Sequence, residues 1–331
     1  MDNTNIVNTS EASKVMKQRD MKKVARKQLI VKIISLVLIY AFLLIVAISV
    51  LFPFYFMLIS SVKTIDEFYE VKPALLPWQF NGGDNWTEYI MWDNYKDVFN
   101  PGSKRHSLDL GLLMGNTLFV GVVSTLISLV ITVLSAFAFA RLEFKGKNAL
   151  FAALLATMMI PGELFTITNF VTVYSFSTDP LLSWMGPNTY GVLIVPFLVS
   201  VFYIYLLKQN FQQVPNELYL AAKVDGTTDL KYLWKVMIPL ALPTIISITI
   251  LKMMGSWNSY AWPKLVANDG AHALITNGLR DAMFSSGDVG ALPDIPLQMA
   301  AVALVSLPLF LVFIFLRKYI MKGVSRSGIK G

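Results

Sequence analysis

The sequence predicts an all-α integral membrane protein with six transmembrane helices, and three observations support this fold class. The chain has 331 residues, of which 55% are hydrophobic and 15% charged, and long uncharged runs recur along it. About 20 apolar residues suffice to cross a bilayer. Lys and Arg gather in alternate loops between the runs, which predicts an orientation. One polar segment, 208–235, interrupts the apolar second half of the chain.

The first predicted span follows a polar leader, 1–32, which carries eight Lys and Arg residues. The run from 33 to 62 has 30 uncharged residues, too many for the core of a cleavable signal, so we expect an uncleaved span and a cytoplasmic leader. One transmembrane domain, 33–320, is expected to end in a cytoplasmic tail, 321–331. The other five predicted spans are 110–140, 149–176, 190–207, 236–260 and 295–316. The span 149–176 is expected to be broken by Pro161-Gly162-Glu163.

Charge is distributed unevenly between the two sets of predicted loops. The four segments assigned to the cytoplasm hold 20 Lys and Arg residues against 7 Asp and Glu, whereas the three outer loops hold 7 against 13. Positive charge is retained on the cytoplasmic side of a membrane. Both termini are therefore expected inside the cell, as an even number of spans requires.

The polar segment has the pattern of two short helices joined by a sharp corner. Residues 217–224 are good helix formers, and Asp225-Gly226 fits a helix end because Gly tolerates the left-handed conformation. Thr227 or Thr228 fits the cap of a second helix. The alternative is an ordinary cytoplasmic loop in which Gly226 merely ends a helix.

Several kinds of chemistry are disfavoured by the composition. The chain has no Cys and only two His residues, so no thiolate or imidazole cluster for a metal is predicted. Gly146-Lys147-Asn148 lacks the rest of a nucleotide-binding loop. We predict no catalytic residue and no metal site. The basic residues flank apolar runs, which indicates membrane orientation and no nucleic-acid partner.

Two ionisable residues lie inside predicted spans, and we expect them to contribute to a translocation path. Glu163 and Lys252 lie at similar depth by residue count, and charges are costly in lipid, so each is expected to face protein or a water-filled cavity. Trp257 and Asn258 follow Lys252 and join this candidate set. The alternative is that Glu163 reaches the interface and Lys252 snorkels to it, with the tryptophans forming an interfacial belt.

A spaced pattern of residue types runs through the polar segment. Its members are Pro215, Glu217, Leu218, Ala221, Ala222, Asp225, Gly226 and Pro239. In this order they resemble the EAA loop of ABC-importer permeases, which docks into a cleft of the ATP-hydrolysing subunit. Leu220 departs from the pattern, because the family usually has Glu there. Glu217, one turn earlier on the same face, is the candidate substitute for that carboxylate.

Further fragments extend the resemblance over most of the chain from about residue 50. They are Ser61-Val62-Lys63-Thr64, Asn94-Tyr95-Lys96-Asp97-Val98-Phe99, Asn116-Thr117, Ala138-Phe139-Ala140-Arg141, Met159-Ile160-Pro161-Gly162-Glu163, Ser256-Trp257-Asn258 and the terminal stretch 323–331. Together they resemble the second permease subunit of maltose-type carbohydrate importers. The resemblance implies the type I ABC importer permease fold, a place in the bacterial cell membrane and import of a sugar or oligosaccharide.

The resemblance also implies partners. They are a second permease subunit, two ATP-binding subunits and an extracytoplasmic solute-binding protein, so ATP is bound by other chains and this chain holds no cofactor. Two alternatives stay open. One is an ABC permease for another solute such as glycerol phosphate, and the other is a self-sufficient secondary transporter or channel, which would show paired broken helices in two related halves.

Overall fold

The computed structural model describes residues 3–69, 90–100, 109–284 and 292–325, and within these ranges all regular elements are helical. The chain divides into two compact units, residues 1–59 and 60–331. The first unit is a single helix, α1 (Asn3–Ser60). The boundary predicted at residue 32 therefore falls inside one continuous helix.

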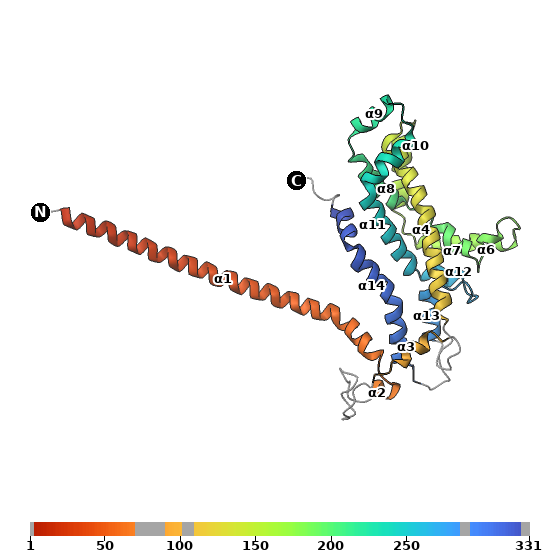
Figure 1. Ribbon diagram of the computed structural model, residues 1–331, viewed down its shortest axis with the longest axis horizontal. Coiled ribbons are helices and arrows are strands. Elements are labelled where there is room, and N and C mark those ends of the chain that lie inside the picture. Colours follow the sequence, from red (N-terminus) through yellow and green to blue (C-terminus); the bar gives the residue numbers. More distant parts are fainter. Residues whose placement is uncertain (1–2, 70–89, 101–108, 285–291, 326–331) are drawn as a thin grey trace. The chain divides into compact units, whose positions relative to one another are not determined.

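Four long helices of the second unit pack along one another (Figure 1). They are α4 (Leu110–Arg141), α8 (Val201–Gln212), α11 (Ile238–Trp257) and α14 (Ile295–Ser325). The helix α4 packs against α8 and α11, and α11 packs against α14. Small polar side chains on the buried face of α4 allow close helix packing in a membrane; they are Thr117, Ser124, Thr125, Ser128 and Thr132.

Within the described residues, four helices are long and apolar enough to cross a membrane, or five if one bent pair counts as a single span. The apolar helices long enough to cross are Gln28–Ser60, Leu110–Arg141, Asp229–Trp257 and Ile295–Arg317, and a pair bent by 44°, Tyr190–Phe197 with Val201–Gln212, gives a fifth. The predicted count of six therefore stays a prediction.

The predicted third span, 149–176, is not one helix. It divides into α5 (Lys147–Thr157) and α6 (Leu164–Ser175), separated by turns that include Pro161. Proline lacks the N–H that a helix interior needs and restricts the preceding residue, which explains the break. In Figure 1, α6 is directed away from α4 and α11. Neither piece is long enough to cross a bilayer alone.

The fourth and fifth predicted spans also differ in detail from the prediction. A break after the 3₁₀ turn Val195–Phe197 separates α7 (Tyr190–Ile194) from α8, where Ser200 caps α8. The helix α10 (Asp229–Tyr232) continues through a π-helical turn, Leu233–Met237, directly into α11. Helix therefore occupies both ends of the predicted loop 208–235, and the polar connection is shorter than the sequence suggests.

Short helices lie at the two ends of the long ones. The helix α9 (Asn216–Val224) lies beside α10 at one end, whereas α2 (Ile65–Tyr69), α3 (Asp93–Val98) and α13 (Ile275–Phe284) lie at the other (Figure 1). The helix α12 (Ala261–Val266) follows α11. The predicted cytoplasmic loop and the described parts of the two long polar loops, 63–109 and 264–294, therefore lie at opposite ends of the bundle (Figure 1).

Hydrogen bonds join α4 to residues 271–275, which precede and begin α13. The amide of Asn116 donates to the carbonyl oxygens of Ala271 and Ala273 at 2.7 and 3.1 Å. The Thr117 hydroxyl accepts from the Ile275 amide at 2.9 Å. The Asn116-Thr117 pair, one of the fragments that carry the family resemblance, thus fastens residues 271–275 to the bundle.

Candidate coupling elbow and transport cavity

The polar segment forms an elbow, defined here as α9, the corner at residues 225–228 and α10. Gly226 has φ of +70°. Its amide donates to the Lys223 carbonyl at 3.0 Å, and the Thr227 amide donates to the Ala222 carbonyl at 2.8 Å. These two bonds form a Schellman motif, which ends a helix with Gly in the left-handed conformation. Thr228 then caps α10.

Side chains brace the elbow across its corner. Asp229, in the first turn of α10, accepts a hydrogen bond from the Tyr219 hydroxyl at 2.7 Å and pairs with the Lys223 ammonium at 2.6 Å. The hydrogen bond to Asp229 raises the pKa of Lys223 above its ordinary value, so the ammonium stays charged at neutral pH. The Tyr219 ring also packs on the buried ring of Tyr232, with centroids 5.1 Å apart. The two helices therefore hold a defined angle.

Arg141, the last residue of α4, joins the elbow to the bundle. Arg141 is 9% exposed. Its guanidinium donates to the backbone carbonyls of Phe211 and Val214 and to the side-chain oxygen of Asn216. The first two carbonyls lie at the end of α8, where the Phe211 carbonyl also accepts from the Val214 amide at 3.3 Å. The sequence places Arg141 in a basic turn, but its role in positioning α9 depends on tertiary contacts that no local pattern reveals.

One face of α9 has no partner within the described part of the chain. Glu217, Leu220, Ala221 and Val224 follow helical spacing and are all exposed, with Leu220 55% and Val224 88% exposed. Residues at i, i+3, i+4 and i+7 share one face. Tyr219 and Ala222, on the opposite side, pack on the bundle. The elbow thus presents an apolar stripe with one carboxylate.

The other predicted loop residues frame this stripe. Asp225 is exposed at the end of α9, next to Gly226 at the corner. Pro239 is exposed at the start of α11, directly after the π-helical turn Leu233–Met237. The helix, corner and second helix have the order that the sequence predicts.

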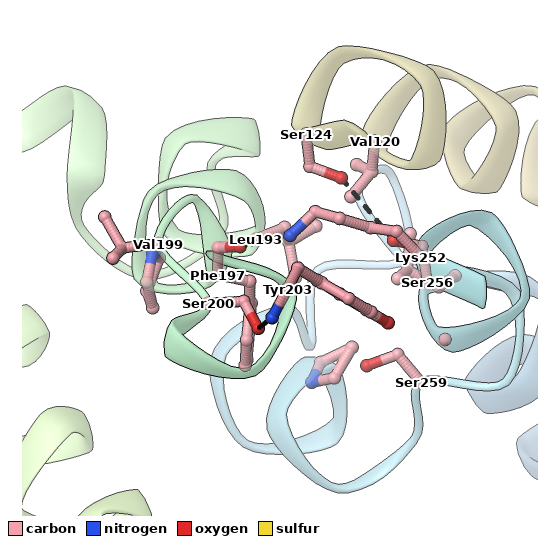
Figure 2. Close-up of a pocket in the computed structure, with 14 residues that line it drawn as sticks. Val120, Ser124, Leu193, Phe197, Val199, Ser200, Tyr203, Lys252, Ser256 and Ser259 are labelled. Atoms are coloured by element: carbon pink, nitrogen blue, oxygen red, sulfur yellow. Dashed lines mark hydrogen bonds between the residues drawn. The ribbon is translucent and has the colours of Figure 1, made fainter. Parts of the chain in front are cut away.

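A cavity of about 370 Å³ lies between α4, the break that joins α7 to α8, α11 and α12 (Figure 2). Its walls are apolar with interspersed hydroxyl groups. The lining residues are Val120, Ser124, Leu193, Pro196, Phe197, Val199, Ser200, Tyr203, Lys252, Gly255, Ser256, Ser259, Pro263 and Leu274.

Lys252 is the cation of this cavity. It is 8% exposed, and its ammonium donates to the carbonyl oxygen of Phe197 at the helix break. Figure 2 shows the side chain extending from α11 towards the segment that carries Phe197. Nearby, the hydroxyls of Ser124 and Ser256 lie 3.4 Å apart and join α4 to α11.

Of the four residues proposed for a translocation path, only Lys252 lines this cavity. Glu163 is exposed at the start of α6 and is not among the lining residues. Trp257 is 5% exposed, and its indole N–H donates to the Val305 carbonyl at 3.2 Å, within the packing of α11 on α14. Asn258 is exposed and donates to the Met254 carbonyl.

The structure places these four residues in different surroundings, and helix breaks and packing explain why. Residue counts along two straight helices predict a similar depth for Glu163 and Lys252. The break at Pro161 turns α6 away from α4 and α11 (Figure 1), so equal counts do not bring the two charges together. Trp257 faces α14, a neighbour that the sequence of α11 does not identify.

Metal-binding clusters are absent from the described ranges, where no group of three His, Asp or Glu residues could hold an ion. His272 pairs with Asp269 at 2.6 Å in the connection between α12 and α13. The other histidine, His106, lies outside the described residues.

Comparison with known protein families decides the class of protein. Residues 107–326 match the family described as the binding-protein-dependent transport system inner membrane component. The chain belongs to this family. It is therefore a transport permease component and not an enzyme, and it is an integral inner membrane protein of a system that depends on a binding protein. The family resemblance read from the sequence is confirmed.

Individual relatives cover nearly the whole chain. The polygalacturonan/rhamnogalacturonan transport system permease protein YtcP of Bacillus subtilis is 28% identical over 304 residues, 89% of this chain and 97% of the relative. The sn-glycerol-3-phosphate transport system permease protein UgpE of Pectobacterium atrosepticum is 25% identical, covering 87% and 95%. The fold is similar to a crystal structure of a bacterial ABC transporter that imports alginate, with a TM-score of 0.72 at 20% identity, covering 86% and 95%.

Proposed function

We propose that this chain is one of two permease subunits of an ATP-driven importer for a sugar or oligosaccharide. The partners are a second permease subunit, two ATP-binding subunits and an extracytoplasmic solute-binding protein. ATP is bound by the ATP-binding subunits, so this chain needs no cofactor of its own. Both termini lie in the cytoplasm, in keeping with the excess of Lys and Arg in the segments on that side.

The exposed stripe of α9 carries the proposal. An amphipathic helix normally turns its apolar face to the protein, yet here Leu220 and Val224 face away from the bundle. Exposed apolar patches of this kind mark interaction sites. We assign the stripe to the docking cleft of an ATP-binding subunit, with Glu217 as its polar contact and Leu220 in the place of the more common Glu.

The elbow is built to transmit force. The bond from Arg141 to Val214, the pairing of Lys223 with Asp229 and the continuous helix from Asp229 to Trp257 connect the docked face to the bundle. A displacement of α9 therefore moves α4 and α11 together. Closure of the ATP-binding subunits at one end would rock these helices and change access to the cavity at the other, which is alternating access.

Carbohydrate is the favoured substrate class because of the relatives. One is a permease protein for polygalacturonan and rhamnogalacturonan, and the solved structure belongs to an alginate importer. A second candidate, glycerol phosphate, is favoured by the similarity to UgpE. Both candidates are polyhydroxylated solutes, which suits the hydroxyl-rich lining of the cavity.

The test is reconstitution of the four-component importer in liposomes. We expect uptake of a labelled oligosaccharide only when ATP and the binding protein are both supplied. The purified chain alone should give no uptake. Transport by the chain alone without ATP would contradict the proposal and favour a self-sufficient transporter, and ATP-driven uptake of glycerol phosphate without any oligosaccharide would establish the second candidate.

A further inference from the structure

The cavity holds a cation without a counter-ion. Its polar side chains are one ammonium and five hydroxyls, and no lining residue is acidic. Among the described residues, no carboxylate lies within ion-pair distance of Lys252. An isolated charge removed from water is costly unless it is paired or hydrogen-bonded. The hydroxyl groups belong to Ser124, Ser200, Tyr203, Ser256 and Ser259.

The ammonium of Lys252 also retains donor capacity. A lysine has three N–H donors, and one is used by the Phe197 carbonyl. The hydroxyls of Tyr203 and Ser259 make no hydrogen bond to other described residues, and both face the cavity. Figure 2 shows the Tyr203 side chain reaching the pocket from α8 and the Ser259 side chain from the connection between α11 and α12, both below Lys252 in that view. The cavity therefore contains unused N–H donors of Lys252 and free hydroxyl groups, and no acidic side chain among the described residues lines it.

We propose that this cavity binds an anionic group, a carboxylate or a phosphate, carried by the polyhydroxylated solute that the importer moves. Lys252 binds the anion, and the hydroxyls of Tyr203 and Ser259 bind hydroxyl groups of the same solute. This inference rests on the proposed function and narrows its substrate class to acidic sugars or sugar phosphates.

The dimensions fit this role. Ligand pockets usually enclose about 300–1,000 Å³, and a cavity of about 370 Å³ has room for a small solute or the end unit of an oligosaccharide. The apolar walls, which include Leu193, Phe197 and Leu274, keep the local dielectric low. A charge pair is stronger in such a setting than in water.

A purely structural role for Lys252 makes a different prediction. If the ammonium served only to support the helix break through the Phe197 carbonyl, its loss would weaken the binding of acidic and neutral solutes equally. If the ammonium instead recognises an anion, its removal should weaken the binding of acidic solutes and leave the binding of neutral solutes unchanged. The ratio of the two affinities separates the two roles.

The experiment measures solute binding to the assembled importer in detergent without the binding protein, so that the preference of that protein does not enter. The probes are a galacturonate trimer, its neutral methyl ester and glycerol phosphate. For the wild type we expect one acidic probe or both to bind about tenfold or more tightly than the ester. A trimer preference identifies carboxylate as the ligand group, and a glycerol phosphate preference identifies phosphate.

Substitutions of the cation complete the test. Lys252→Met should abolish the preference for the acidic probe and leave the affinity for the ester within about twofold of the wild-type value. Lys252→Arg should keep most of the preference for the acidic probe, because the charge remains. Lys96→Met, which removes an exposed cation of α3, is the matched control and should bind like the wild type. Equal weakening of all probes by Lys252→Met would overturn the inference, as would a wild type without preference.

Parallel uptake assays keep this inference separate from the proposed function. ATP-driven uptake of neutral oligosaccharides with no preference for acidic ones would overturn the anion site and leave the importer intact. Absence of ATP-driven uptake for every carbohydrate tested would instead overturn the proposed carbohydrate function.

Discussion

At the scale of single residues, two positions hold the elbow in shape for different reasons. Gly226 supplies a backbone conformation that other residues resist, and Arg141 donates hydrogen bonds to backbone carbonyls at the end of α8. The first was predictable, because Asp-Gly after a run of helix formers is a local signal. The second was not, since residues 141 and 211 are far apart in the sequence.

Gly226→Val is expected to abolish transport while the protein still inserts into the membrane. A Cβ at this position meets nothing within 4 Å, so the cost is conformational, about 1–2 kcal/mol for the left-handed backbone and more for a β-branched residue. Gly226→Asn is the control, because Asn tolerates this conformation and should retain most uptake. Wild-type uptake in the Val variant would refute the importance of the corner.

Arg141→Met is expected to loosen the elbow from the bundle. It removes charged hydrogen bonds to two backbone carbonyls, which together should cost about 2 kcal/mol or more. We expect a lower midpoint of thermal unfolding in detergent and loss of solute-stimulated ATP hydrolysis by the complex. Lys145→Met removes an exposed cation of the same turn and should change neither. Equal behaviour of the two variants would show that Arg141 does not position α9.

At the scale of elements, helix breaks decide where side chains point. Pro161-Gly162 predicted the division between α5 and α6, but the direction taken by α6 depends on packing and left Glu163 outside the cavity. The break between α7 and α8, near Pro196, was missed, because a single Pro in an apolar run does not show whether a span bends or continues. That break is what exposes the Phe197 carbonyl to Lys252.

The exposed face of α9 yields a prediction about attachment of the ATP-binding subunits. Leu220→Lys places a charge within the apolar stripe, and Glu217→Lys reverses its one carboxylate, so each should reduce the amount of ATP-binding subunit that co-purifies with the permease. Lys231→Glu, a charge reversal in α10 outside the stripe, is the control. Unchanged yields for both stripe variants would show that this face is not the docking surface.

At the scale of the whole molecule, charge and hydropathy predicted more than any single motif. The uneven distribution of Lys and Arg placed 208–235 on one side and the long polar loops on the other, and the structure has the elbow and α2, α3 and α13 at opposite ends of the bundle (Figure 1). Charge and hydropathy do not establish the count of six spans. The region 147–175 consists of two short helices, and hydropathy does not define how deep they lie in a membrane.

The fold class and the family followed from the sequence because they depend on local patterns and on their order. The cavity did not, because its lining comes from segments as distant as Val120 and Leu274. Lys252 was singled out by the cost of burying a charge, a rule that holds whatever the neighbours. Trp257, chosen by its place near a span end, packs on α14.

Site-directed labelling tests the central claim most directly, that the elbow lies in the cytoplasm and is held by an ATP-binding subunit. The chain has no Cys, so Ala221→Cys, on the exposed face of α9, introduces a unique thiol. A membrane-impermeant maleimide should label it in inside-out vesicles, not in intact cells, and the assembled ATP-binding subunits should protect it. Labelling from outside intact cells would contradict the orientation, the docking and the import mechanism together.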